Sequence, residues 1–139
     1  MAPATQTILI VDDEPSDLAL LEEVLARRGY TVITAKDADH AIELAQRNRF
    51  DLLLTDVAMA PVNGCELAMR LMASRQDLRV LFISGHVGEE ALRYQKVPAG
   101  ARFLRKPFTP DDLLRKVRES LQDRPEEGSF SASAPSNGS

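Results

Sequence analysis

Side chains that could do phosphate or metal chemistry follow four separate hydrophobic runs of this sequence, each just beyond the end of the run. They are Asp12 and Asp13 after the first run, Asp56 after a run of leucines, Ser84 after a later run, and Lys106 after the last. Taken alone, Asp56 is an ordinary strand-end residue that caps the following turn. Because chemically suitable residues recur at four run ends, we expect them to form one site.

The types of these residues predict a particular chemistry. Asp12, Asp13 and Asp56 together offer a hard, strongly negative oxygen site, which is the kind of site that Mg²⁺ takes. Carboxylates this close repel one another without a cation, so Mg²⁺ should both bind and stabilise the fold. A carboxylate can also act as a nucleophile and form an aspartyl phosphate. Lys106 would then neutralise phosphoryl charge, and the Ser84 hydroxyl would donate to a phosphoryl oxygen.

Five short apolar runs predict the strands that must position these residues. The runs are rich in leucine and β-branched residues and are apolar at nearly every position, which is typical of strands buried on both faces. The predicted strands are Thr7–Val11, Tyr30–Ala35, Asp51–Thr55, Arg79–Ile83 and Ala101–Leu104.

Five segments with apolar residues at helical spacing predict helices after the strands. The first starts at Pro15 and ends at Gly29, and the others are Asp37–Arg49, Gly64–Ser74, Glu89–Gln95 and a last helix that Thr109 caps. This alternation predicts an α/β fold, doubly wound, with a five-stranded parallel sheet and five helices on both faces. Ligands bind such sheets at the carboxyl ends of the strands, where the candidate residues fall.

Length and composition limit the other possibilities. The chain has 139 residues and a net charge of −4, which gives no broad electrostatic reason to bind nucleic acid or an anionic membrane. The single cysteine, Cys65, excludes an internal disulfide and a site built from paired cysteines. No secretory signal and no apolar stretch of ~20 residues is present, so we expect a soluble cytoplasmic protein.

The composition changes near the C-terminus. From Pro125 onward Ser, Ala, Pro, Gly and Asn dominate, and such a segment cannot bury enough apolar surface to offset its ordering entropy. We therefore expect a short N-terminal extension over residues 1–6, one folded domain over 7–123, and a disordered tail over 124–139.

The motifs together resemble the receiver domain of two-component response regulators, over Thr7 to Leu121. The resemblance rests on Val11-Asp12-Asp13-Glu14, on Thr55-Asp56 with Gly64 eight residues later, on Ser84-Gly85, and on Lys106-Pro107-Phe108. It implies the flavodoxin-like strand order 2-1-3-4-5. The runs around Ser84 and Lys106 are also similar to those of receivers in hybrid histidine kinases.

The resemblance implies a role for each site residue. Asp56 would accept a phosphoryl group from a histidine kinase or a histidine phosphotransfer protein, assisted by Lys106 and Ser84. Asp13, Asp56 and the backbone carbonyl of Ala58 would bind Mg²⁺, with Asp12 acting largely through a bound water. Such a protein is a signalling phosphoacceptor and not an enzyme, because it supports only its own phosphorylation and slow hydrolysis of the aspartyl phosphate.

The resemblance also implies a conformational switch on phosphorylation, a surface for partners, and residues that tune dephosphorylation. Ser84 and Phe103 would move on phosphorylation, and the surface of the fourth helix, fifth strand and last helix would then meet a partner or a second copy. A phenylalanine in a strand is equally consistent with plain core packing. Ala58 and His86 would tune dephosphorylation by controlling water access, although His86 also fits a solvent-facing loop. The Lys106-Pro107 peptide bond is expected to be cis.

Three other functions are weighed against this one. A phosphohydrolase of the haloacid dehalogenase type needs a second aspartate two residues after the nucleophile, where this chain has Ala58. A flavin-binding module needs a phosphate loop after the first strand, where Asp12-Asp13-Glu14 would repel a phosphate. A receiver-like interaction module that works without phosphorylation would not need the complete set of site residues.

Overall fold

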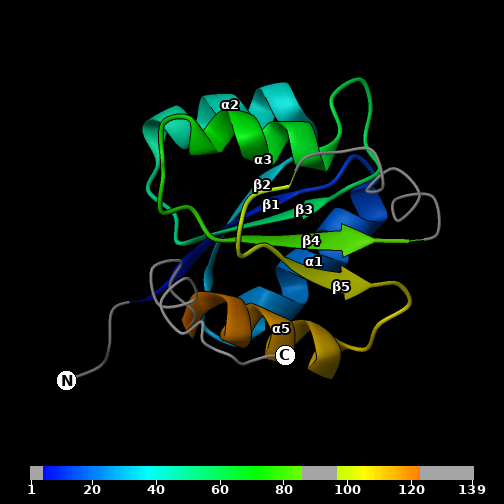
Figure 1. Cartoon of the computed structure of the whole chain (residues 1–139). Helices are drawn as coiled ribbons and strands as arrows, with labels where there is room; N and C mark the ends of the chain where they lie inside the picture. The colour runs from blue at the N-terminus through cyan, green and yellow to red at the C-terminus, as the bar shows by residue number, and fades with distance from the viewer. Residues whose placement is uncertain (1–4, 86–96, 123–139) are drawn as a thin grey trace.

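A computed structural model describes residues 5–85 and 97–122 of the chain. Its five strands form one parallel sheet in the order β2-β1-β3-β4-β5, as predicted (Figure 1). The strands are β1 (Thr7–Val11), β2 (Thr31–Ala35), β3 (Leu52–Asp56), β4 (Val80–Ser84) and β5 (Arg102–Arg105).

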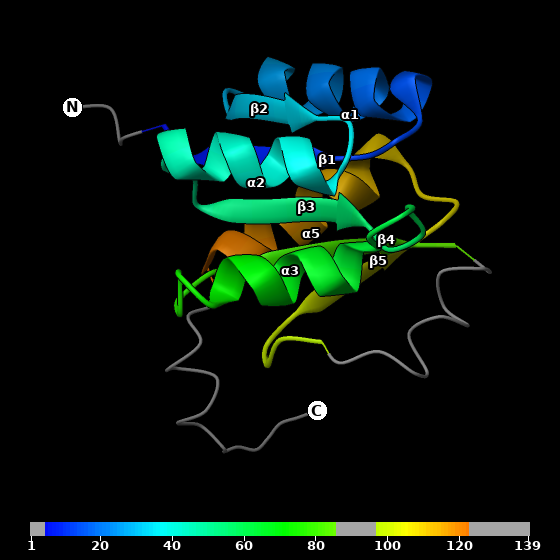
Figure 2. The same ribbon diagram turned by 90° about the horizontal axis from the view of Figure 1, so that it is seen from above.

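Helices cover both faces of the sheet. Helices α2 and α3 lie on one face, and α1 and α5 lie on the other (Figures 1 and 2). The described helices are α1 (Pro15–Arg27), α2 (Ala38–Arg47), α3 (Gly64–Met72) and α5 (Pro110–Gln122). The helix predicted at Glu89–Gln95 lies outside the described residues, as do His86 and the tail over 124–139.

The apolar strands are explained by two separate cores. Leu53 of β3 packs into the core beneath α2 and α3, whereas Leu52 and Leu54 pack into the core beneath α1 and α5. All three side chains are fully buried. Because successive side chains point to opposite faces of a strand, a strand covered on both faces must be apolar at every position.

Side-chain caps fix where the helices begin. The Asp37 carboxylate accepts a hydrogen bond from the His40 backbone N–H at 2.8 Å, so Asp37 precedes α2 and is not part of it. Thr109 Oγ1 accepts from the Asp112 N–H, and the Asp112 carboxylate accepts from the Thr109 N–H, both at 3.0 Å. This reciprocal pair confirms that Thr109 caps the last helix.

Two helices end earlier than the sequence pattern predicts. The predicted helices run to Arg49 and Ser74, but α2 ends at Arg47 and α3 ends at Met72. At the end of α2, the Arg75 guanidinium donates to the backbone carbonyls of Ala45 and Asn48 at 2.8 and 2.7 Å. The Asn48 side chain also donates to the Leu44 carbonyl at 2.9 Å, so α2 ends through a local cap together with a long-range contact. No helix within the described part of the chain is long and apolar enough to cross a membrane.

Candidate functional site

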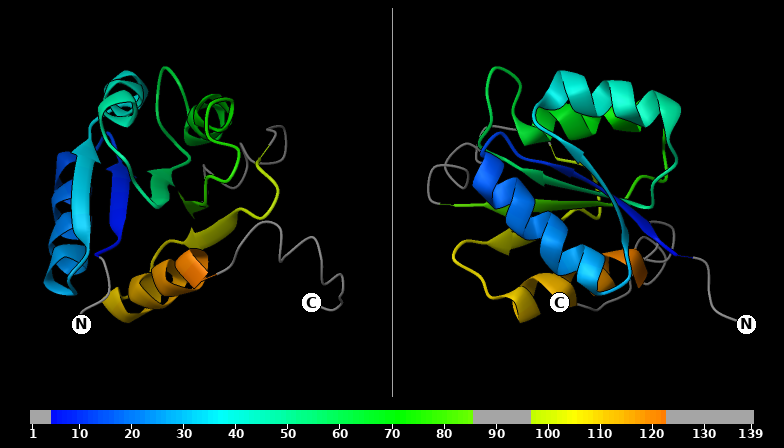
Figure 3. Two further views of the ribbon diagram at one scale, coloured as in Figure 1. Left: turned by 90° about the vertical axis from the view of Figure 1, so that its left-hand side faces the viewer. Right: turned by 180° about the vertical axis from the view of Figure 1, so that it is seen from behind.

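The carboxyl ends of β1, β3, β4 and β5 meet at one edge of the sheet, as Figure 3 shows from two further sides. The strand register pairs Asp56 with Ile83 and Ser84 with Arg105. The Lys106 N–H donates to the Ser84 carbonyl at 2.9 Å, which continues the pairing beyond β5. The topology therefore brings together residues that are far apart in the sequence.

Asp56 lies at the centre of this edge as the last residue of β3. It is buried, with 6% of its surface exposed. Its Oδ1 accepts a hydrogen bond from the Ala58 N–H at 3.0 Å, and its Oδ2 accepts one from Lys106 Nζ at 3.3 Å. Each carboxylate oxygen thus has a donor, which is the condition for burying a charged group.

Gly64 explains the backbone beyond Asp56. A Cβ atom at Gly64 would clash with the Asp56 carbonyl oxygen and lie only 3.1 Å from Thr55 Oγ1. The Gly64 N–H donates to the Val57 carbonyl at 3.0 Å, which draws the start of α3 against the end of β3. The glycine eight residues after Asp56 is therefore required by close backbone approach.

Asp12 has an unusual environment for a carboxylate. It is 1% exposed, and its Oδ1 accepts a hydrogen bond from the Glu14 N–H at 2.9 Å. Its Oδ2 is the one buried side-chain polar atom in the described residues without a hydrogen-bond partner. Burial raises the pKa of Asp12 to about 6, and the nearby charges of Asp56 and Asp17 act in the same direction. A buried carboxylate oxygen left without a donor favours a cation as its missing partner.

The donor set fits Mg²⁺, which takes one or two carboxylates and completes its shell with water. Asp12 and Asp56 supply two carboxylates, and Ala58, whose carbonyl is the predicted further ligand, is exposed between the buried residues Val57 and Met59. Asp13 is exposed. Across residues 5–85 and 97–122, no three acidic, histidine or cysteine side chains are grouped closely enough to hold a metal. A role for Asp13 as a metal ligand stays a prediction.

Lys106 is the cation of the site. Burial acts to lower the pKa of its ammonium group, but the carboxylates of Asp56, Asp12 and Asp17 outweigh that effect and leave the pKa raised. Its Nζ lies 3.3 Å from Asp56 Oδ2 and 3.8 Å from Asp17 Oδ2. The Lys106-Pro107 bond is cis, which confirms the prediction, and Ala60-Pro61 is also cis.

Sequence reasoning missed Asp17. An acid in the first turn of a helix is ordinary, because it interacts favourably with the helix dipole. The available signal was its place in the first turn of the helix that follows Asp12 and Asp13, which brings the start of α1 to the same edge of the sheet.

The predicted switch and tuning residues lie in different surroundings. Ser84 is buried at the end of β4, whereas Phe103 is 36% exposed and stacks on Phe82 with ring centroids 5.3 Å apart. Phe103 therefore lies at the margin of the core and not within it. Ala58 is exposed in the loop after Asp56, and His86 lies outside the described residues. The switch and tuning roles stay predictions.

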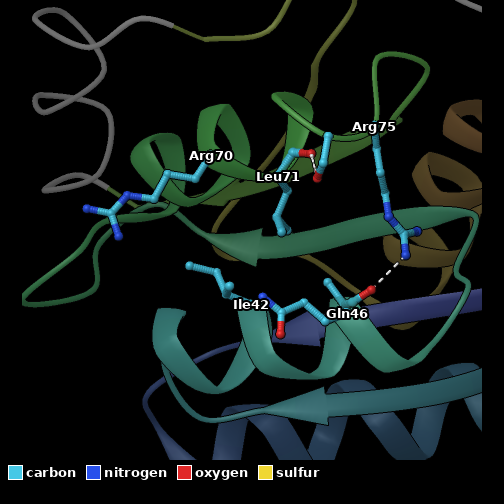
Figure 4. A pocket seen from close by; sticks show the side chains of 7 residues that line it. Ile42, Gln46, Arg70, Leu71 and Arg75 are labelled. Carbon is cyan, nitrogen blue, oxygen red and sulfur yellow. Dashed lines mark hydrogen bonds between the residues drawn. The ribbon is translucent and has the colours of Figure 1, made fainter.

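A hollow lies apart from these residues, between α2 and α3 (Figure 4). Its volume is about 460 Å³, and Ile42, Gln46, Arg70, Leu71 and Arg75 are among the residues that line it. None of the predicted site residues lines it. The candidate site is therefore the group of residues at the sheet edge and not this hollow.

Comparison with known proteins gives consistent matches. The family model of the response regulator receiver domain matches residues 8–118. The response regulator receiver protein CpdR of Brucella abortus is 32% identical over 114 residues, which cover 82% of this chain and 95% of that protein. The chemotaxis protein CheY4 of Vibrio cholerae has a TM-score of 0.78 at 29% identity, over 85% of this chain and 100% of that chain. The response regulator TrrA of Thermotoga maritima, in complex with Mg²⁺ and BeF, has a TM-score of 0.74 at 28% identity, over 84% and 100% of the two chains.

Several of the curated relatives are longer than this chain, and the match covers only part of their length. The chain spans 44–53% of the length of several other curated relatives, to which it is 33–34% identical. The family model nevertheless covers nearly all of the folded part of this chain, from β1 into α5. The chain therefore belongs to the family of response regulator receiver domains.

Proposed function

We propose that Asp56 is the phosphoacceptor of this receiver domain and takes its phosphoryl group from a phosphohistidine. The donor would be a histidine kinase or a histidine phosphotransfer protein. The observation that carries the proposal is the pairing of the buried Asp56 carboxylate with Lys106 Nζ at 3.3 Å, at the sheet edge where Asp12 Oδ2 has no partner. The proposed domain spans residues 7–123.

In the proposed reaction, a carboxylate oxygen of Asp56 attacks the phosphorus atom. The P–N bond to the donor histidine breaks, the histidine nitrogen keeps the electron pair, and a P–O bond to Asp56 forms. Lys106 neutralises charge on the phosphoryl oxygens, and the Ala58 N–H keeps the carboxylate oriented through Oδ1. Phosphoryl transfer depends mainly on this kind of positioning and charge neutralisation.

Mg²⁺, when bound, supplies further neutralisation of phosphoryl charge. The residues that would hold it are Asp12, Asp13, Asp56 and the backbone carbonyl of Ala58. The unpartnered Oδ2 of Asp12 and the raised pKa of that carboxyl, at about 6, support a cation there.

The proposed output is a change at the surface of the predicted fourth helix, β5 and α5. Ser84 would donate its hydroxyl to a phosphoryl oxygen, and Phe103 would turn inward from its half-exposed position against Phe82. On this surface, Arg102 of β5 pairs with Glu119 of α5 at 3.6 Å. A partner protein or a second copy of the chain would bind this surface after phosphorylation has rearranged ion pairs such as the one between Arg102 and Glu119. Ala58 and His86 would set how readily water reaches the phosphoryl group.

The proposal is tested with acetyl phosphate as a small phosphodonor. Incubation with Mg²⁺ should add one phosphoryl group to the intact protein, as measured by mass spectrometry, and release acetate. Asp56→Asn should remove that added mass, and so should chelation of Mg²⁺. Persistence of the mass in Asp56→Asn would refute the assignment. The chain should show no catalytic turnover beyond its own phosphorylation and slow dephosphorylation.

A further inference from the structure

The ammonium group of Lys106 lies between carboxylates from two different elements. Asp56, at the end of β3, accepts a hydrogen bond from Nζ at 3.3 Å. Asp17, in the first turn of α1, has its Oδ2 at 3.8 Å from the same nitrogen. The Asp56 side chain is 7% exposed, whereas the Asp17 side chain is 45% exposed. Lys106 is thus shared between a buried partner and a half-exposed one.

The capping pattern of α1 explains why Asp17 faces this lysine. An acid at the third position of a helix often reaches back to the N–H of the capping residue. Here the capping residue is Glu14, and its N–H already donates to Asp12 Oδ1 at 2.9 Å. Within the described residues, Lys106 is the one cation at ion-pair distance from Asp17. The Asp17 carboxylate is therefore left to interact with the site.

A lysine ammonium is a compact charge that carries three donors, so nearby acceptors compete for its position. Attraction toward Asp17 draws Nζ toward α1 and away from Asp56. A phosphoryl group on Asp56 needs the same cation to neutralise its oxygens. A half-exposed ion pair is weak, so the competition should change rates by a small factor and not abolish the reaction.

We propose that Asp17 is a positioning residue that competes with Asp56, and with the phosphoryl group bound to it, for the Lys106 ammonium. This inference rests on the proposed function of Asp56 as the phosphoacceptor. Its consequence is that the wild-type chain is phosphorylated more slowly than a chain that lacks the carboxylate at position 17.

The first test compares Asp17→Asn with two matched variants. Asp17→Asn should raise the second-order rate of phosphorylation by acetyl phosphate with Mg²⁺ by about two- to fivefold, the factor expected from losing one weak ion pair. Asp17→Glu keeps the charge and should stay near the wild-type rate. Asp39→Asn makes the same charge change in the first turn of α2 and should leave the rate unchanged. Equal rates for wild type and Asp17→Asn would overturn the inference.

A double-mutant cycle separates competition for Lys106 from a general effect of charge on the anionic donor. In the Lys106→Gln background, Asp17→Asn should no longer accelerate phosphorylation, because the shared cation is gone. If the acceleration persists there, Asp17 acts by repelling acetyl phosphate directly, and the positioning role is wrong.

A third measurement does not depend on phosphorylation. The side-chain ¹⁵Nζ resonance of Lys106, assigned by its loss in Lys106→Gln, should shift in Asp17→Asn and stay in place in Asp39→Asn. An unchanged resonance in Asp17→Asn would contradict the pairing. If no variant and no wild-type protein takes up a phosphoryl group, the proposed function fails, and this resonance still decides whether Asp17 holds Lys106.

Discussion

At the scale of single residues, the site is defined by which polar atoms have partners. Both oxygens of Asp56 have hydrogen-bond donors, whereas Asp12 Oδ2 has none among the described residues. The difference matters because an unpaired buried polar atom is costly unless a cation or water satisfies it. Both oxygens of Asp56 are thus hydrogen-bonded, whereas Asp12 has an oxygen available to a cation.

The raised pKa of Asp12 predicts a pH-dependent stability. Burial raises the pKa from 3.8 to about 6, so between these values the folded chain holds a proton that the unfolded chain releases. The free energy of unfolding should therefore fall as pH rises from about 4 to 6, by at most roughly 3 kcal/mol. Urea denaturation with a chelator present measures this change.

Asp12→Asn is the control, because it removes this titrating group and leaves the acids away from the site unchanged. The variant should lose less stability than the wild type across the same pH range. An equal loss in both proteins would show that Asp12 does not titrate between these values.

Gly64 lies so close to the Asp56 carbonyl that one added methyl group at position 64 should destabilise the fold. Gly64→Ala should lower the free energy of unfolding by about 1–3 kcal/mol, because its Cβ would meet the Asp56 carbonyl and force the backbone to shift. It should also slow phosphorylation, since that carbonyl belongs to the phosphoacceptor. Gly85→Ala is the matched control, because its Cβ would meet nothing closer than Lys106 Cδ at 3.8 Å. Equal stability of the two variants would contradict the account.

At the scale of elements, a long-range contact joins α3 to the end of α2. Arg75 follows α3 and reaches across to the end of α2 (Figure 4). It donates there to two backbone carbonyls and lies 4.1 Å from the centre of the Phe50 ring. These contacts join the two helices that cover one face of the sheet. A planar guanidinium can lie flat over the ring while it donates to both carbonyls, a geometry that a compact ammonium does not reproduce.

Arg75→Ala should therefore lower the free energy of unfolding by about 1–3 kcal/mol, because it leaves carbonyl groups of Ala45 and Asn48 without a donor. Arg75→Lys should recover only part of this loss. Arg70→Ala removes an exposed pair with Glu66 and should change stability by less than about 0.5 kcal/mol. Urea denaturation compares the three variants, and similar values for Arg70→Ala and Arg75→Ala would refute the role of Arg75.

At the scale of the whole molecule, the alternation of apolar runs and amphipathic segments was enough to predict the sheet. The parallel order then places Asp12, Asp56, Ser84 and Lys106 at one edge, as their positions after the strands indicated. These features were predictable because burial on both faces leaves a strong local pattern. The strand order 2-1-3-4-5 came from the resemblance to receiver domains, and the structure confirms it.

Other features depend on contacts that no local pattern records. At the end of α2, the local Asn48 cap is joined by Arg75, which lies 27 residues after Asn48 in the chain. The role of Asp17 depends on the Glu14 N–H being taken by Asp12. The half-exposed Phe103 lies on β5, the edge strand of the sheet, where one side of its ring stacks against Phe82 of the neighbouring strand. Each follows from three-dimensional packing, which overrides what the spacing of residues suggests.

The central claim is that Asp56 accepts the phosphoryl group, and chemical trapping tests it most directly. After incubation with acetyl phosphate and Mg²⁺, borohydride reduces an aspartyl phosphate to homoserine, which peptide mass mapping locates. The account predicts homoserine at position 56 and none at Asp12 or Asp13. Homoserine at either of those positions, or none anywhere in phosphorylated protein, would contradict it.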